Sequence, residues 1–241
     1  MTLTVAAISD LHGHLPAVPA CDLLLIAGDI CPSSWPGPQA GWLAGAFRRW
    51  LDAVPAREVV AVAGNHDWAF ESWDNRRAFE VDPGGADPLV LPGLRWHYLE
   101  DRAVEVFGLR IYGTPWQLRC GNWAFNVDEP VLAERFARIP DDTDIVLSHS
   151  PPFGIGDLAP RRNGGGEHVG SPSLLDRVRR VRPRLHVFGH IHEARGRWQE
   201  DGTTFANVSV LDGRYDMVHQ PMVFKINTSR DDTGGVTIHP E

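Results

Sequence analysis

The stretch EVVAVAGNHD, residues 58–67, runs from a continuous apolar segment into a set of polar side chains. An apolar run of this length, rich in Val, predicts a strand that is buried on both faces. Comparable runs recur at residues 3–8, 22–27, 104–112, 143–148, 184–188, 204–210 and 222–226. The chain is therefore expected to have a core built on β-strands.

Helical patterns lie between these runs. Apolar residues over 43–51 recur at helical spacing and fall on one face. Asp128 predicts the start of a helix over 131–139, and Ser171 followed by Pro172 predicts the start of another. We therefore expect helices on both sides of the middle of the chain.

The order of these elements indicates the fold class. Strands that alternate with helices in the first half predict right-handed βαβ units, whereas the hairpin-like stretch 103–112 and the closing strands predict antiparallel pairing. The Pro/Gly-rich stretch 82–93 predicts a long surface loop within one domain. We predict a single domain over residues 1–241 with a mixed α/β layered fold.

The composition excludes several classes of protein. Lys and Arg number 23 against 31 Asp and Glu, a formal net charge of -8, which argues against a broad nucleic-acid-binding surface because such a surface needs clustered cations. The longest apolar runs are far shorter than the roughly 18 residues of a membrane span, and the N-terminal residues MTLTVAAISD do not read as a signal peptide. The 3 cysteines match no CxxC spacing, which fits a reducing compartment, so we expect a cytoplasmic protein. Because the apolar runs are short, we expect it to contact no membrane.

Polar side chains follow five of the predicted strands at the point where each strand ends. The strand ends of an α/β sheet are where ligand-binding residues converge, so these side chains are expected to lie close together. The set is Asp10, His12, Asp29, Asn65, His66, His149, His190 and His192.

The donor atoms of this set indicate the ligand. Imidazole nitrogens combined with carboxylate and amide oxygens suit divalent transition metals such as Mn, Fe or Zn, and the lack of thiolates disfavours a structural zinc site. Two such ions roughly 3.5–4 Å apart can clamp the attacking and departing oxygens of a displacement at phosphorus. The residue types therefore favour a site for two divalent metal ions that acts on phosphoesters.

The order of these motifs resembles the calcineurin-like metallophosphoesterases, whose signature DxH, GD, GNHD, H and GHxH is complete here. The corresponding residues are Asp10-Leu11-His12, Gly28-Asp29, Gly64-Asn65-His66-Asp67, His149 and Gly189-His190-Ile191-His192. Further stretches are similar to the small metallophosphoesterase-domain branch: SDLHG at 9–13, GLRIYGTPW at 108–116, SHSPPFGIGD at 148–157, RPRLHVFGHIHE at 182–193 and DGTTFANVSV at 201–210. The resemblance implies a four-layer α-β-β-α sandwich, in which two mixed sheets lie face to face with helices outside.

The resemblance also implies a role for each residue of the set. It places Asp10, His12 and His192 on one metal ion, places Asn65, His149 and His190 on the other, and makes Asp29 the bridge between them. His66 would bind no metal and would act as the general acid at the leaving group. Asn65 and His66 are thus the expected catalytic residues.

These observations predict a metal-dependent phosphoester hydrolase in which a metal-bound hydroxide attacks phosphorus. The resemblance favours phosphodiesters, with small or nucleotide-like substrates and Mn as the best activator. A phosphomonoesterase with the same site and a zinc-dependent hydrolase of C–N bonds are the enzymatic alternatives. A non-catalytic scaffold that retains the fold is the alternative from another class.

Candidate substrate contacts lie near these motifs. His14 follows the first ligands, and its side chain either contacts the substrate or is only solvated. Arg161 and Arg162 lie in the loop after His149, where they can meet the substrate. The aromatic side chains at Trp116, Trp123 and Phe153 either line a pocket that stacks a base or aryl group, or pack in the core.

Overall fold

The fold is a sandwich of two mixed β-sheets, seen in a computed structural model that describes residues 1–33, 37–71, 93–161 and 164–228. The strands of the first sheet lie in the order β15-β1-β2-β3-β4. Their bounds are β1 Thr2–Ile8, β2 Cys21–Ala27, β3 Ala56–Val62, β4 His97–Tyr98 and β15 Met222–Asn227. Strands β1 to β4 are parallel, and β15 pairs antiparallel with β1.

The second sheet has the order β13-β14-β12-β9-β6-β5. Its strands are β5 Arg102–Val106, β6 Leu109–Thr114, β9 Ile145–Ser148, β12 Leu185–Phe188, β13 Gly196–Glu200 and β14 Thr203–Asn207. The inner strands are parallel, and the two edge strands β5 and β13 are antiparallel to their neighbours. The hairpin predicted over 103–112 is therefore confirmed as β5 and β6.

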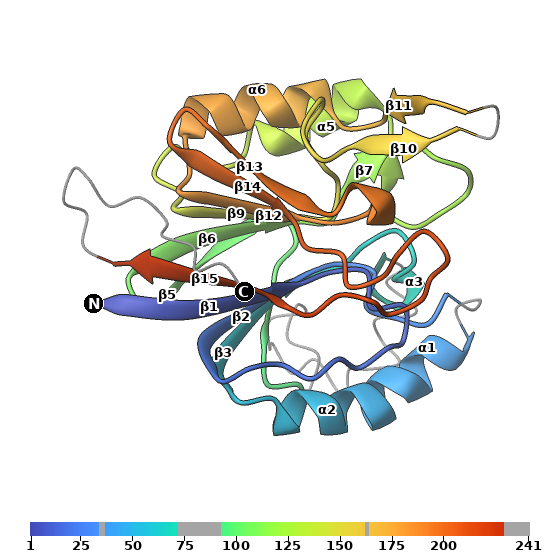
Figure 1. The fold of residues 1–241 in the computed structure, drawn as a ribbon, viewed down its shortest axis with the longest axis vertical. Coiled ribbons are helices and arrows are strands. Elements are labelled where there is room, and N and C mark those ends of the chain that lie inside the picture. Colours follow the sequence, from blue (N-terminus) through green and yellow to red (C-terminus); the bar gives the residue numbers. More distant parts are fainter. Residues whose placement is uncertain (34–36, 72–92, 162–163, 229–241) are drawn as a thin grey trace, which may run out of the picture.

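Helices cover the outer face of each sheet (Figure 1), which confirms the predicted four-layer α-β-β-α sandwich. One outer layer is a continuous helical stretch of α1 Gly37–Trp42, a π-helical turn Leu43–Phe47 and α2 Arg48–Ala53, and the other is α5 Glu129–Phe136 with α6 Pro172–Val181. Short elements complete the described chain: α3 Trp68–Glu71, β7 Gln117–Leu118, β8 Asn126–Val127, β10 Leu158–Pro160, β11 Gly166–His168 and a 3-10 turn His192–Ala194. No helix in the described ranges is long and apolar enough to cross a bilayer.

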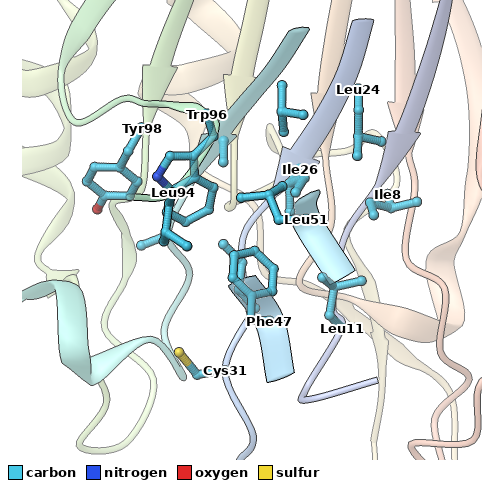
Figure 2. Close-up of a cluster of buried hydrophobic side chains, with 14 of the residues drawn as sticks. Ile8, Leu11, Leu24, Ile26, Cys31, Phe47, Leu51, Leu94, Trp96 and Tyr98 are labelled. Atoms are coloured by element: carbon cyan, nitrogen blue, oxygen red, sulfur yellow. The ribbon is translucent and has the colours of Figure 1, made fainter. Parts of the chain in front are cut away.

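Alternating burial along the strands divides the core into layers. Leu23 and Leu25 face the second sheet, whereas Leu24 and Ile26 face the helical layer, because successive side chains of a strand point to opposite faces. Figure 2 shows Phe47 among the side chains of this outer layer. A third cluster joins the second sheet to α5 and α6.

Some local predictions need correction. The helix after Asp128 ends at Phe136 rather than at 139, and Asp128 makes no side-chain capping bond because its carboxylate pairs with Arg119 at 2.9 Å. Ser171 does cap α6, since its hydroxyl accepts from the amide of Leu174. The parallel strands β1 and β2 are joined without a helix, whereas α1 and α2 connect the parallel strands β2 and β3 as the βαβ pattern predicts. Most of the predicted loop at 82–93 lies outside the described residues.

Candidate metal centre

The carboxyl ends of β1, β2, β3, β9 and β12 meet at one edge of the sandwich. The amide of Asp10 donates to the carbonyl of Gly28 at 3.0 Å, and the amide of His12 donates to the carbonyl of Asp29 at 2.8 Å. The amide of His190 donates to the carboxylate of Asp10 at 3.0 Å. These backbone contacts join loops from both sheets and bring the predicted ligands together.

Four of the predicted ligands have a left-handed backbone. The φ angles are 57° for Asp10, 42° for His12, 52° for Asp29 and 72° for His190. This conformation is unfavourable for residues with a Cβ, and such strain clusters at functional sites where the surrounding structure enforces it. The backbone thus aims these side chains at one point at a cost in local stability.

Asp10, His12 and His192 form the first group of donor atoms. One ligand atom from each lies within 4.8 Å of the others, and all three residues are buried. The Nε2 atom of His192 lies 3.5 Å from Oδ1 of Asp10, while Nδ1 of His192 donates to the carbonyl of Asp212 at 3.1 Å. A partner on the second ring nitrogen fixes the tautomer that presents Nε2 to the site.

Asn65, His149 and His190 form the second group. The Oδ1 atom of Asn65 lies 2.9 Å from Nε2 of His149 and 2.9 Å from Nδ1 of His190. The other nitrogen of His149, Nδ1, donates to the carbonyl of Ala27 at 2.9 Å. Three potential ligand atoms therefore converge from three different strand ends.

The carboxylate of Asp29 lies between the two groups. Its Oδ2 atom is 3.4 Å from Nε2 of His12 and 3.5 Å from Nε2 of His149. Its Oδ1 atom accepts from the amide of His66 at 2.7 Å. This position fits the bridging role that the sequence predicts for Asp29.

Burial and neighbouring charges set the protonation of the site. Burial opposes ionisation of Asp10, but the hydrogen bond and charge of His192 outweigh it and lower the pKa of Asp10 to about 2. Burial also opposes protonation of His149, yet the charge of Asp29 raises the pKa of His149 to about 9. Burial lowers the pKa of His190 to about 3 and that of His12 to about 4. The site thus combines ionised carboxylates with neutral imidazoles at His12 and His190, the forms of these groups that bind metal ions.

The donor set fits divalent cations. Two buried ring nitrogens, Nε2 of His12 and Nδ1 of His66, have no hydrogen-bond partner within the described part of the chain. Buried polar atoms normally have partners, and the distances of 3.4 and 3.5 Å around Asp29 are long for hydrogen bonds. A bound cation would satisfy Nε2 of His12 and the carboxylates together. His12, Asp29 and His66 form a further possible ligand group, so the exclusion of His66 from metal binding stays a prediction.

Asp67 supports the site from behind, a role that sequence reasoning did not assign. Its carboxylate accepts from the amides of Ile30 at 3.0 Å, Cys31 at 2.7 Å and Gly64 at 2.8 Å. These bonds tie the loop after β3 to the loop after β2. A Cβ at Gly64 would collide with Asp29 and with the ring of His149, so glycine is required there for the close approach.

The other predicted substrate residues lie among other partners. His14 is exposed, Phe153 is 43% exposed with its ring 5.5 Å from that of His168, and Arg161 pairs with Glu167 at 2.8 Å. The indole nitrogen of Trp116 donates to Asp101 at 3.0 Å, and the guanidinium of Arg135 lies over the indole at 3.5 Å from its centroid. These contacts favour a packing role for Trp116 over a role in stacking a substrate. Arg162 lies outside the described residues.

Two aromatic side chains contact the site instead. The ring of Trp123 lies 4.2 Å from the ring of His66. The sequence is compatible both with a Trp123 that packs in the core and with one that stacks a substrate. The ring of Tyr215 lies 4.8 Å from that of His12. Tyr215 lies outside every predicted strand and helix, and no sequence signal marked it.

Comparison with known proteins defines the class. Residues 3–194 match the family of calcineurin-like phosphoesterases, so the chain belongs to that family of metal-dependent phosphoesterases. It is 34% identical over 244 residues to "Metallophosphoesterase domain-containing protein 1" of Homo sapiens, which covers 93% of this chain and 71% of the relative. It is 33% identical over 240 residues to "UPF0046 protein T07D4.2" of Caenorhabditis elegans, covering 89% and 58%. The structure of TT1561 of Thermus thermophilus has the same fold, with a TM-score of 0.56, 17% identity and coverage of 86% and 89%.

Proposed function

We propose that this metallophosphoesterase is a phosphodiesterase that acts on small or nucleotide-like substrates with two Mn ions. The observation that carries the proposal is the position of Asp29 between the two donor groups, with Oδ2 at 3.4 Å from His12 and 3.5 Å from His149. A carboxylate in this position can be shared by two cations. Two shared cations suit displacement at phosphorus because they act on the attacking and departing oxygens together.

When bound, the cations supply an activated water molecule at neutral pH and neutralise charge on the phosphoryl oxygens. The chain's own residues hold those ions and the ester in place. Asp29 accepts from the amide of His66 at 2.7 Å, which fixes the His66 loop against the centre. The Nδ1 atom of His66, which has no partner among the described residues, is available to carry the proton for the leaving oxygen.

The acidity of His66 suits this role. Burial lowers its pKa from the ordinary value, opposed by the charge of Asp29, so its protonated form is a stronger acid than a solvated imidazole. An anionic ester beside the ring favours the protonated form. Proton transfer to the leaving oxygen then follows as the phosphorus–oxygen bond breaks.

Two features of the site favour a diester over a monoester as the substrate and Mn as the metal. Apolar aromatic rings border the site at Trp123 and Tyr215, and such a border favours a singly charged diester, which has a second organic group, over a dianionic monoester. Carboxylate and amide oxygens beside imidazoles suit Mn better than an all-nitrogen set would. We also propose a reducing compartment such as the cytoplasm, because Cys21, Cys31 and Cys120 are unpaired.

The test combines metal analysis with substrate comparison. The purified protein is assayed for bound metal by mass spectrometry and then, with Mn, Fe, Zn or Mg, for hydrolysis of bis(4-nitrophenyl) phosphate, 4-nitrophenyl phosphate and a 4-nitroanilide. We expect two ions per chain and fastest hydrolysis of the diester with Mn. Faster monoester hydrolysis would overturn the diesterase assignment, and metal-loaded protein that cleaves neither ester would favour the scaffold alternative. Cleavage of the anilide alone would favour a C–N hydrolase.

A further inference from the structure

Two partly exposed aromatic side chains border the metal centre, and the reaction described above gives neither a role in the chemistry. The ring of Trp123 lies 4.2 Å from that of His66 with an interplanar angle of 33°. The ring of Tyr215 lies 4.8 Å from His12 and 4.9 Å from His192. Trp123 is 36% exposed and Tyr215 is 46% exposed. We call Trp123 and Tyr215 the aromatic rim.

The backbone fixes Trp123 relative to His66. The amide of Ala124 donates to the carbonyl of Asn65 at 3.0 Å, which joins the residue after Trp123 to the residue before His66. The pairing of β7 with β8 closes the base of the loop, and the side-chain amide of Asn126 donates to the carbonyl of Cys120 at 3.1 Å inside it. The indole is therefore held over the imidazole by the same loops that position the proposed general acid.

A strained turn holds Tyr215 at the other side. Its φ angle is 66°, which is unfavourable for an aromatic residue. The turn is closed by a bond from the amide of Tyr215 to the carbonyl of Asp212 at 3.0 Å, and the same carbonyl accepts from Nδ1 of His192 at 3.1 Å. Strain of this kind persists where the structure enforces it, and here it directs an aromatic ring at two ligand residues.

The aromatic rim lies next to the expected position of the leaving group of the substrate. His66 and His12 are in ring contact at 4.6 Å, so Trp123 contacts one end of this pair and Tyr215 contacts the other. A leaving oxygen that takes its proton from His66 lies about 3 Å from the imidazole. The group bonded to that oxygen then lies beside the indole that covers His66.

We infer that Trp123 is a specificity-determining residue that stacks an aromatic group of the ester, an aryl ring or a nucleobase, with Tyr215 as the opposite wall. This inference rests on the proposed function, because it places the phosphoryl group at the metal centre and the leaving oxygen at His66. Stacking of a base on an aromatic side chain tolerates different rings, since every ring has a π face. The rim therefore selects aromatic over aliphatic groups without reading a particular base.

The test measures binding of phenylphosphonate and methylphosphonate to the Mn-loaded protein by calorimetry. Both probes present a phosphonate to the metals, neither can be hydrolysed as an ester, and only one has a ring. We expect the wild type to bind phenylphosphonate about 5- to 150-fold more tightly, the range that stacking contributes. Trp123→Leu should reduce this ratio to below about twofold, with unchanged metal content and unchanged affinity for methylphosphonate, whereas Trp123→Phe should keep most of the ratio.

Trp198 provides a matched control. It is 37% exposed, nearly the same as Trp123, but it lies on the edge strand β13, where its indole covers Gly156. Trp198→Leu should keep the wild-type ratio, and Trp123→Met gives a second non-aromatic variant should Trp123→Leu fold poorly. A ratio that persists in the non-aromatic Trp123 variants, or a wild type without a preference, would overturn the inference. Binding is measured separately from turnover, so the two proposals can fail independently. An enzyme that cleaves diesters but has no preference for phenylphosphonate would refute only the stacking role of Trp123. A protein that prefers phenylphosphonate but cleaves no ester would refute only the proposed function.

Discussion

The Oδ1 atom of Asn65 lies 2.9 Å from Nε2 of His149, although 84 residues separate the two along the chain. The same oxygen contacts Nδ1 of His190 at 2.9 Å. Asn65→Ala should remove one ligand from the second metal ion and weaken its binding by at least about 10- to 100-fold. Metal titration should show one tight ion instead of two, with hydrolysis reduced in parallel. Two tight ions in this variant would remove Asn65 from the ligand set.

Metal removal should destabilise the whole fold. Asp10 and Asp29 are buried within one candidate ligand group, and cations offset their mutual repulsion. A metal at about 100 times its dissociation constant adds about 2.7 kcal/mol per site, so chelation should lower Tm by roughly 5 to 10 °C per site. Thermal melts with and without EDTA give this shift, and Asp29→Ala should melt at nearly the same temperature in both. An unchanged wild-type Tm would argue against metal binding by the folded state.

His66→Ala should separate chemistry from metal binding. Loss of a general acid costs about 10²- to 10⁴-fold in turnover, while both donor groups remain intact. Metal content and diester hydrolysis are measured on the same preparation. His97→Ala is the control, because His97 pairs with Glu58 at 3.0 Å on a half-exposed part of the first sheet. Full activity in His66→Ala would remove this residue from the mechanism, and loss of a metal ion would make it a ligand.

Gly189 should not tolerate a side chain. A Cβ at this position would collide with Oγ of Ser9 and Oδ2 of Asp10, and the displaced carboxylate should reduce metal affinity by at least about tenfold. Gly41→Ala is the matched control, since no atom lies within 4 Å of a Cβ there. Gly41 lies in α1, where alanine should add about 0.5 to 1 kcal/mol of stability. Wild-type metal affinity in Gly189→Ala would show that the loop adjusts freely.

His186 should make the fold sensitive to acid. Its side chain is fully buried, with Nε2 at 2.8 Å from Oγ of Ser148, and burial lowers its pKa from 6.5 to about 3. Between these values the unfolded chain binds more protons than the folded chain, so stability falls as pH decreases through this window. This residue should account for roughly 2 to 3 kcal/mol lost between about pH 6.5 and 4.5.

The variant His186→Gln tests this assignment, because a glutamine amide can still hydrogen-bond to Ser148 and does not titrate. Urea unfolding with EDTA at both pH values should show a smaller loss of stability in the variant than in the wild type. An equal loss in both proteins would assign the acid sensitivity to other groups.

Features encoded by neighbouring residues were predictable. The apolar runs predict the strands because alternating or continuous burial depends on residues within one segment, and Ser171 predicts the start of α6 because a cap acts within three residues. The end of α5 was not predictable in this way. The local pattern continues to 139, but the observed helix ends at Phe136.

The donor types, their order and their places after strands can be predicted from the sequence, since each of these is a property of a short segment. Which of these atoms meet depends on the tertiary structure. The contact from the amide of His190 to Asp10 spans 180 residues, and Asp29 becomes central only when two sheets pack face to face. Tyr215 reaches His12 through a strained turn, and Trp116 packs under Arg135 instead of at the site. Such contacts depend on how distant segments pack against each other, and a local pattern of residues does not predict that packing.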